Sequence, residues 1–303
     1  MSPKDSRPSA LAGPIFFLSD YGTRDEFVGV VHAVLAASAP RATVIDLTHR
    51  IPAFDVRAGA HTLARAAPHL GSGVVLAVVD PGVGSSRRGL CLQCEAVDGG
   101  PTHFVGPDNG ILVAAAELVG GGSIARAFEL SRRGPADDHR GTFDGRDLFA
   151  PAAAALCAGT RAELLGELID PGSLVRLLPG VVEHGRLPDG RHCLRVEVTW
   201  VDHFGNVQLA ATLADALVAS LSFMDAVSVT AVVESDLVTR PGWPSALVPE
   251  SATLRCVETF ADLDRGELGL LVDANEHLAV VVGEGSAGHW LNVEAGELVV
   301  LAW

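Results

Sequence analysis

The fold is decided by the stretch GVVLAVVD, residues 73–80. Its apolar residues do not alternate with polar ones and the run ends in an aspartate, which is typical of a strand buried on both faces. Two shorter runs precede it, IFFL at 15–18 and TVIDL at 43–47, and both predict strands. Helical apolar spacing separates the three runs, at 25–37 and 56–67. This alternation of strands and helices predicts an α/β domain with a parallel sheet covered on both faces.

The character of the sequence changes at residues 179–190, which are rich in Gly, Pro and polar residues. We place a linker there. Beyond it, short strand-like runs follow one another closely up to the C-terminus, which indicates a small β-barrel or sandwich. The sequence therefore predicts two domains, an N-terminal parallel-sheet α/β domain over 14–180 and a β-rich domain over 190–303.

Polar segments follow several of the predicted strands. Asp20 follows the first strand, and DPGVGSSR at 80–87 follows the strand quoted above. GPDNG at 106–110 follows another predicted strand, and TFDGRD at 142–147 leads into a helix. Ligands bind at the carboxyl ends of parallel strands, so these segments indicate one binding rim. The alternative is that the aspartates cap helices and the glycines form turns, and spacing alone does not decide between the two.

Composition disfavours several classes of partner. The formal net charge of -15 argues against nucleic acid and anionic membrane surfaces, because both are bound by clustered Lys and Arg. Residues 1–13 are polar and Pro/Ser-rich, which predicts a disordered tail rather than a signal peptide, and the apolar runs are too short to span a bilayer. The five cysteines are odd in number and scattered, which predicts reduced thiols in a cytoplasmic protein.

Common cofactor motifs do not occur in the sequence. There is no GxxxxGK[ST] loop and no HExxH, and the GVG at 82–84 lacks the third glycine of a dinucleotide fingerprint. Cys91 and Cys94 lie on a predicted strand, 89–97, where residues three apart point to opposite faces and chelate a metal poorly. We therefore expect no metal and no cofactor.

Five motifs occur in order along the chain: SDYG at 19–22, DPGVG at 80–84, PDNG at 107–110, TFDGRDLFAP at 142–151 and DHFGN at 202–206. Together they resemble the S-adenosyl-L-methionine hydroxide adenosyltransferases, relatives of the fluorinase and chlorinase. The resemblance runs from about Ile15 to the C-terminus. It implies an α/β domain followed by a C-terminal β-barrel domain, assembled as a homotrimer with the ligand between domains of neighbouring subunits. The implied activity is hydrolysis of S-adenosyl-L-methionine, a small-molecule substrate, to adenosine and L-methionine.

The resemblance also implies roles for single residues. Asp20 would bind the two ribose hydroxyls, and Phe54 would lie beside the nucleoside. Asp202 would pair with the methionine ammonium group. Asn275 would hold the methionine carboxylate, although the halogenases carry Arg there. The remaining substrate-binding positions would be Phe204, Asn206, Phe260, Val282 and Glu284 around adenine, with Asn109 and Phe143 inside their motifs.

The catalytic set of the hydroxide-using members is an Asp, an Arg and a His. Asp80 and Arg87 match the first two, and the third position is Asp144, where this sequence departs from the family. Either Asp144 substitutes for the His, or the nearby His139 takes part, or activity is reduced. We favour the first, because a carboxylate can accept a proton from water or orient it.

The same residues bear on the choice of nucleophile. A halide must lose its hydration shell and needs neutral or positive donors. Asp80, with Asp144 close by, would repel it, whereas a carboxylate kept ionised by Arg87 can accept a proton from water. The fluorinase's long insertion between Arg87 and Phe104 is also missing. We expect hydrolysis; the alternatives are a halide-dependent adenosyltransferase and a non-catalytic protein that binds S-adenosyl-L-methionine or adenosine.

Overall fold

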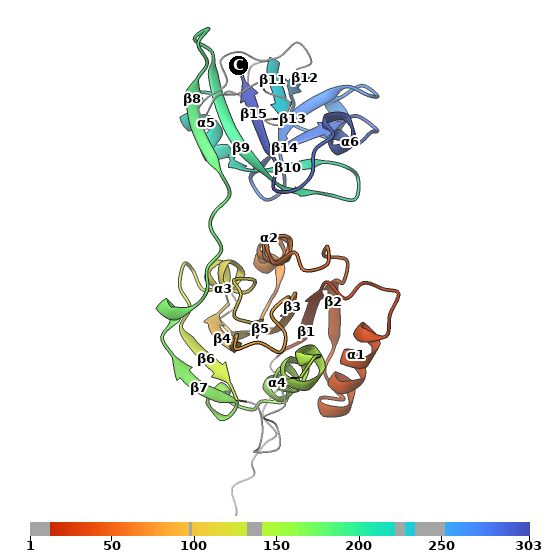
Figure 1. Ribbon diagram of the computed structural model, residues 1–303, viewed down its shortest axis with the longest axis vertical. Helices are drawn as coiled ribbons and strands as arrows, with labels where there is room; N and C mark the ends of the chain where they lie inside the picture. Colours follow the sequence, from red (N-terminus) through yellow and green to blue (C-terminus); the bar gives the residue numbers. More distant parts are fainter. Residues whose placement is uncertain (1–12, 97–98, 132–140, 222–227, 234–251) are drawn as a thin grey trace, which may run out of the picture. The chain divides into compact units, whose positions relative to one another are not determined.

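The computed structural model describes residues 13–96, 99–131, 141–221, 228–233 and 252–303. The chain divides into two compact units, Met1–Leu177 and Leu178–Trp303, each with its own sheet and apolar core (Figure 1). Some positions named in the sequence analysis lie outside the described residues. They are His139, residues 1–12 of the predicted tail, and residues 97, 226, 227 and 251 of predicted strands.

The first unit is built on a seven-stranded sheet in the order β2-β1-β3-β5-β4-β6-β7. Its strands are β1 (Ile15–Ser19), β2 (Val44–Thr48), β3 (Gly73–Val78), β4 (Gly89–Glu95), β5 (Pro101–Pro107), β6 (Arg126–Leu130) and β7 (Gly166–Ile169). β2, β1, β3 and β5 are mutually parallel, and Ile15 lies opposite Val44 on one side and Val74 on the other. The carboxyl ends of these four strands therefore share one edge of the sheet.

The sheet is mixed, which corrects the prediction of a parallel sheet. β4, β6 and β7 run antiparallel to their neighbours. The length of the connections gives the reason, because a crossover between parallel strands needs about a dozen residues or more. Only residues 96–100 join β4 to β5, and within them the backbone N–H of Ala96 donates to the carbonyl of Gly100 at 2.9 Å.

Helices cover both faces of this sheet (Figure 1). They are α1 (Phe27–Ser38), α2 (Val56–Ala66), α3 (Val113–Val119) and α4 (Ala150–Cys157), with single turns η1 (Ala67–His69), η2 (Gly145–Phe149), η3 (Ala162–Leu164) and η4 (Pro171–Ser173). α1 packs against α4, and α2 packs against α3. Ile15 and Phe17 share one core cluster with residues of α1 and α4. Since successive strand residues point to opposite faces, Phe16 and Leu18 are buried on the other side.

The second unit is built on an eight-stranded sheet in the order β10-β14-β13-β12-β11-β15-β9-β8. Its elements are β8 (Val182–Arg186), β9 (His192–Val201), β10 (Val207–Thr212), α5 (Leu213–Val218), β11 (Ser228–Val233), β12 (Ala252–Cys256), η6 (Phe260–Asp262), β13 (Leu268–Val272), β14 (His277–Val282), α6 (Ala287–Leu291) and β15 (Leu298–Ala302). β9 pairs with β10 as well as with β15 and β8, so the sheet curls round its own apolar core like a half-barrel.

The stretch at 179–190 is not a plain linker. It contains β8, which pairs with β9 from Val182 to Arg186. β8 is the last strand in the sheet order, and none of its residues is buried. It therefore needs no alternation of apolar and polar residues, and its polar composition does not identify it as a strand. The apolar pattern likewise does not reveal β6, β7, α5 or α6. Within the described ranges, no helix combines the length and apolar character that crossing a bilayer requires.

Candidate active site

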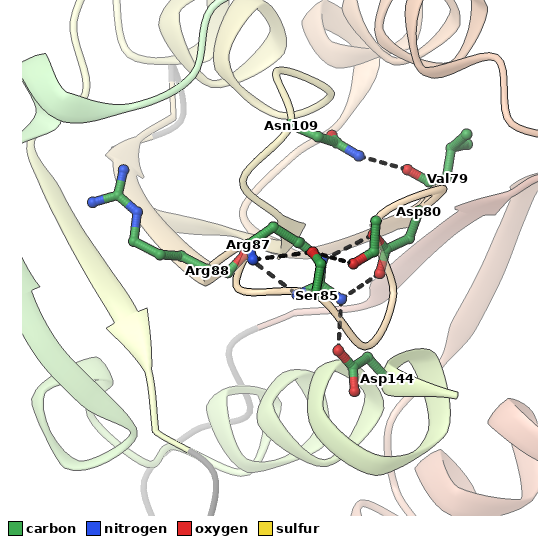
Figure 2. Close-up of polar contacts among 8 residues, drawn as sticks. Val79, Asp80, Ser85, Arg87, Arg88, Asn109 and Asp144 are labelled. Atoms are coloured by element: carbon green, nitrogen blue, oxygen red, sulfur yellow. Dashed lines mark hydrogen bonds and ion pairs between the residues drawn. The ribbon is translucent and has the colours of Figure 1, made fainter. Parts of the chain in front are cut away.

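Asp80 lies just beyond the end of β3, at the edge where the parallel strands present their carboxyl ends. The loop after it folds back on itself. Ser85 Oγ donates to the carbonyl of Gly82 at 2.6 Å and accepts from the backbone N–H of Arg87 at 3.2 Å. Gly84 has a φ of 78°, a conformation that side chains disfavour. The loop thereby returns Arg87 to Asp80, as Figure 2 shows.

Arg87 binds two carboxylates at once (Figure 2). Its Nε donates to Asp80 Oδ1 at 2.8 Å, and its Nη2 donates to Asp80 Oδ2 and, at 2.6 Å, to Asp144 Oδ2. The side chains of Arg87, Asp80 and Asp144 are 11%, 6% and 1% exposed, so water and salt screen these contacts little. The guanidinium also lies over the ring of Phe149, with Cζ 5.0 Å from the ring centroid. The three predicted catalytic side chains thus form one connected cluster.

Among the described residues of this cluster, two carboxylates face one guanidinium. Burial disfavours the charge on Arg87, but the hydrogen bonds and charges of Asp80 and Asp144 outweigh that effect and raise the pKa of Arg87. Arg87 is therefore a permanent cation that fixes the orientation of both carboxylates. Such a pair of fixed carboxylates can orient a water molecule and accept its proton.

Asp144 comes directly before η2, a π-helical turn that runs into α4. Turns of this kind are rare and occur often at functional sites. The backbone N–H groups of Arg146 and Asp147 both donate to the carbonyl of Phe143, at 3.1 and 3.0 Å. The turn therefore holds Asp144 at the start of the helix and turns its side chain toward Arg87.

The turn also packs against Tyr21, which the sequence analysis did not single out. A Cβ placed on Gly145 would lie 2.0 Å from the Tyr21 hydroxyl, so glycine is required there. The Tyr21 ring contacts the rings of Phe27 and Phe143, with centroids 5.8 and 5.5 Å away. Phe143, predicted to bind substrate, thus belongs to an aromatic cluster that joins the SDYG and TFDG motifs. Burial raises the pKa of the Tyr21 hydroxyl, which stays protonated.

Asp20 and Phe54, predicted to lie beside the nucleoside, are brought together. Asp20 Oδ2 accepts from the backbone N–H of Phe54 at 2.9 Å. Phe54 has a φ of 69°, a strained conformation for an aromatic residue, and the residue is 73% exposed. Burial raises the pKa of Asp20, and the charge of Asp80 adds to this, while the Phe54 N–H opposes it. The structure therefore offers a carboxylate and an exposed ring at one place.

Asn109 contacts the protein's own backbone. Its Nδ2 donates to the carbonyl of Val79 at 2.8 Å (Figure 2). Its Oδ1 accepts from the N–H of Ile111 at 3.2 Å. Val79 is the residue before Asp80. These contacts give Asn109 a part in positioning the loop that carries Asp80. The contact of Asn109 with substrate, which the sequence analysis predicted, stays a prediction.

Arg88 and Asp108 form an ion pair that the sequence analysis missed. Arg88 Nε donates to Asp108 Oδ2 at 2.8 Å, and its guanidinium also donates to Ser173 Oγ at 3.1 Å and to the Ser173 carbonyl at 2.7 Å. Asp108 Oδ1 accepts from the N–H of Val175 at 2.9 Å. The pair fastens the end of the first unit to the loop that carries Arg87. Two features of the sequence could have indicated this ion pair: the second arginine of the Arg87–Arg88 doublet and the aspartate, Asp108, of the PDNG motif.

In the second unit, Asp202 organises the DHFGN turn. Its carboxylate accepts from the N–H of Phe204, from the N–H of Asn206 and from the Asn206 side-chain amide, each at 2.9 Å. Gly205 has a φ of 86°, and a Cβ there would lie 2.1 Å from Ser286 Oγ. The segment is therefore a tight turn, and it leaves Phe204 75% exposed.

The other predicted residues of this unit lie at the ends of elements. Phe260 begins η6 and is 55% exposed, and Asn275 lies in the turn between β13 and β14. Val282 ends β14, and Glu284 follows with a φ of 52°. β10 pairs with β14, so Asn206, just before β10, lies next to the end of β14. The DHFGN turn and the Val282–Glu284 segment are thus neighbours.

The cysteines of the CxxC pair are both buried in the first unit. Burial raises the pKa of Cys91 to about 12 and that of Cys94 to about 11. Cys94 Sγ donates to the carbonyl of Ala116 at 3.2 Å. Thiols with raised pKa in apolar surroundings are inert structural groups.

Comparison with known proteins covers both units. The model of the SAM hydroxide adenosyltransferase N-terminal domain matches residues 15–166, and that of its C-terminal domain matches residues 196–300. A Salinispora tropica protein named (R)-S-adenosyl-L-methionine hydrolase is 40% identical over 284 residues, which are 93% of this chain and 95% of that protein. A fluorinase from Actinoplanes sp. is 27% identical over 218 residues, 64% of this chain and 70% of that protein. The crystal structure of an uncharacterized conserved protein from Thermotoga maritima has a TM-score of 0.76 and 31% sequence identity, covering 95% of this chain and 100% of that one.

Proposed function

Since this chain belongs to the SAM hydroxide adenosyltransferase family, we propose that it hydrolyses S-adenosyl-L-methionine (SAM) to adenosine and L-methionine. The observation that carries the proposal is the buried Arg87 bound to both Asp80 and Asp144. The 40% identity to a protein named as a SAM hydrolase supports the same reaction.

The reaction is a single displacement at the ribose C5′ carbon. The oxygen of a water molecule forms a bond to C5′ as the bond from C5′ to sulfur breaks, and the electron pair of that bond stays on sulfur. Methionine leaves as a neutral thioether, so the leaving group needs no proton. The SAM cation and water yield adenosine, methionine and one proton. The protein has to hold one water opposite the C5′–S bond and accept that proton.

Asp80 is the proposed proton acceptor. It lies at the carboxyl end of β3, where parallel sheets bind ligands, and Arg87 holds it through two nitrogens. Asp144 stands where the family has His, and its hydrogen bond to Arg87 supports a share in orienting the water. His139 is the competing third residue, and variants of both residues distinguish the two.

The charge of the cluster favours water over halide. Among the described residues the cluster holds two carboxylates for one guanidinium, and this excess of acidic groups disfavours an incoming anion. Asp20 lies near enough for the charge of Asp80 to contribute to its raised pKa, so it adds to this field when ionised. Halide-dependent adenosyl transfer is therefore the second candidate, supported by the 27% identity to a fluorinase.

We propose further that Asp20 and Phe54 bind the ribose and that the second unit supplies the remaining substrate contacts. Those contacts would come from Asp202, Phe204, Asn206, Phe260, Asn275, Val282 and Glu284. The exposure of the Phe204 and Phe260 rings supports a role in stacking on a flat base. We also propose that the curled sheet of the second unit forms a barrel, that the chain assembles as a homotrimer, and that the protein is cytoplasmic. The unbonded state of all five cysteines is compatible with a reducing compartment.

The deciding experiment incubates the chain with SAM in ¹⁸O-labelled water, with and without chloride, and analyses the products by chromatography and mass spectrometry. Hydrolysis places the label in the 5′ hydroxyl of adenosine and does not need chloride. A main product of 5′-chloro-5′-deoxyadenosine would show the halide reaction, and SAM affinity without any product would show a binding protein. The same assay applied to Asp80→Asn tests the proposed proton acceptor. Asp189→Asn is its matched control, because Asp189 forms an exposed ion pair with Arg191, and such a pair contributes little to stability.

A further inference from the structure

His32, Asp46 and His49 form a cluster that the proposed reaction does not use. His32 lies on α1, Asp46 on β2, and His49 directly after β2. One ligand atom from each of the three lies within 4.8 Å of the other two. The cluster therefore joins a helix to the edge strand of the first sheet through three side chains that commonly bind metal ions.

Two distances in this cluster are close to those of a metal site. His32 Nε2 lies 2.9 Å from Asp46 Oδ1, and His49 Nε2 lies 3.1 Å from the same oxygen. Ligand atoms held at zinc distances in a tetrahedron are roughly 3.3 Å apart. Both distances are therefore close to that spacing, and the ligand atoms of the two histidines lie within 4.8 Å of each other.

The environment of His49 points to a ligand. His49 is 7% exposed, and its Nε2 is a buried atom with no hydrogen-bond partner among the described residues. Asp46 Oδ1 is within ion-pair distance of this nitrogen but does not meet it at a hydrogen-bonding angle. A buried polar atom of this kind calls for an explanation, and an ion bound by both atoms supplies one.

The other ring nitrogen of His49 is held as it is in many metal sites. His49 Nδ1 lies 2.8 Å from Ser19 Oγ, and Ser19 Oγ also accepts from the backbone N–H of Tyr21 at 3.3 Å. Metal-binding histidines usually engage their second nitrogen in such a contact, which fixes the ring orientation. The Phe17 ring, 4.5 Å from the His49 ring between centroids, closes the inner side.

We propose that His32, Asp46 and His49 bind a divalent transition-metal ion, Zn²⁺ in the first place, with water completing the coordination. Two imidazole nitrogens and one carboxylate oxygen suit Zn²⁺, whereas Mg²⁺ and Ca²⁺ take oxygen ligands. The side chains of His32 and Asp46 are 35% and 41% exposed, so an ion reaches them from solvent.

The site has a structural consequence for the neighbouring motif. The backbone N–H of Gly22 donates to the carbonyl of His49 at 2.7 Å, and Ser19 directly precedes Asp20. A bound ion would fix His49 and so hold the SDYG turn at both ends. The proposal concerns the binding of the ion and does not depend on the reaction that the chain catalyses.

Zinc binding by the untagged, chelator-treated full chain tests the proposal. Isothermal titration with Zn²⁺ should give one site per chain, and Co²⁺ should give the visible absorption of a low-symmetry nitrogen and oxygen site. His32→Ala and Asp46→Asn should each weaken Zn²⁺ binding by about 10-fold or more. His69→Ala, an exposed histidine outside the cluster, is the control and should bind as the parent chain does.

His32 is partly exposed on a helix, so its replacement by Ala is compatible with folding, which the far-UV circular dichroism of each variant verifies. Unchanged Zn²⁺ affinity in folded His32→Ala and Asp46→Asn overturns the proposal. An equal loss in His69→Ala, or the lack of a stoichiometric site in the parent chain, overturns it as well.

Discussion

Removal of the Asp144 carboxylate tests the arrangement around Arg87 most directly. The Asp144 side chain is 1% exposed and accepts from Arg87 Nη2 at 2.6 Å. Asp144→Ala removes this charge-assisted hydrogen bond, a loss of about 1.5–3 kcal/mol. Because Asp80 still binds Arg87 through two nitrogens, the loss stays below the roughly 3–5 kcal/mol expected when a buried charge keeps no partner.

The expected change in stability is measurable. In a unit of this size, each kcal/mol of lost stability lowers the melting temperature by about 2–4 °C. The melting temperature of Asp144→Ala should therefore fall by about 3–12 °C. Asp144→Asn keeps the shape and one acceptor, so it should lie between the parent and Asp144→Ala in stability. Thermal unfolding followed by circular dichroism provides the measurement.

The same variants separate positioning from catalysis. If Asp144 helps to orient water, Asp144→Ala should lower turnover by about 10-fold or more with SAM affinity nearly unchanged, because Asp80 still accepts the proton. Asp144→His restores the residue of the family and should retain or improve turnover. Adenosine formation by chromatography and SAM binding by calorimetry give the two readouts. Full activity of Asp144→Ala together with an inactive His139→Ala would refute the reasoning and make His139 the third residue.

Three of the other predictions concern single carboxylates, and one concerns packing. Asp80→Asn should lower turnover by about 10²-fold or more at unchanged SAM affinity; near-normal turnover in the folded variant removes Asp80 from the reaction. Gly145→Ala should cost about 1–3 kcal/mol because its Cβ meets the Tyr21 hydroxyl, and Tyr21→Phe should partly restore the melting temperature; no restoration contradicts the clash. The pKa of Asp20 is raised above 3.8, so the stability that its neutral form gives is present below that pH and is lost as pH rises through the folded pKa. Asp20→Asn should therefore gain melting temperature relative to the parent as pH rises from about 4 towards neutrality, and a difference independent of pH argues against this. Asp108→Ala should make the end of the first unit more sensitive to limited proteolysis, and unchanged cleavage kinetics would deny its fastening role.

Apolar patterning predicted β1, β2 and β3 and missed β6, β7 and β8. The run at 73–80 became β3, a strand buried along its whole length, and residues 15–18 became β1. β7 and β8, with the sequences GELI and VEHGR, contain few apolar residues and none that is buried, so their sequences give little apolar signal. The direction of β4 could not be read from its own residues, because it depends on the short connection to β5.

The motifs named the three side chains of the Arg87 cluster but not the residues that support it. Asp80, Arg87 and Asp144 were named from the sequence, and the structure brings their side chains into contact. Arg88 and Tyr21 were not named, since their roles arise from contacts with residues far along the chain. Arg88 meets Ser173 across 85 positions in the sequence, a relation that no local pattern contains.

The sequence by itself determined the alternation of strands and helices from β1 to β3, the two-part layout and the residue types available for the reaction, because apolar period and strand-end position are local properties. Only the tertiary structure decided which of these residues meet. Asp80 and Asp144 lie 64 positions apart, and one guanidinium joins them because β3 and the turn before α4 end at the same edge of one sheet. The grouping of these charges, on which the proposed preference for water as the nucleophile rests, is a property of the folded chain. Its distances depend on packing between segments that share no local sequence signal.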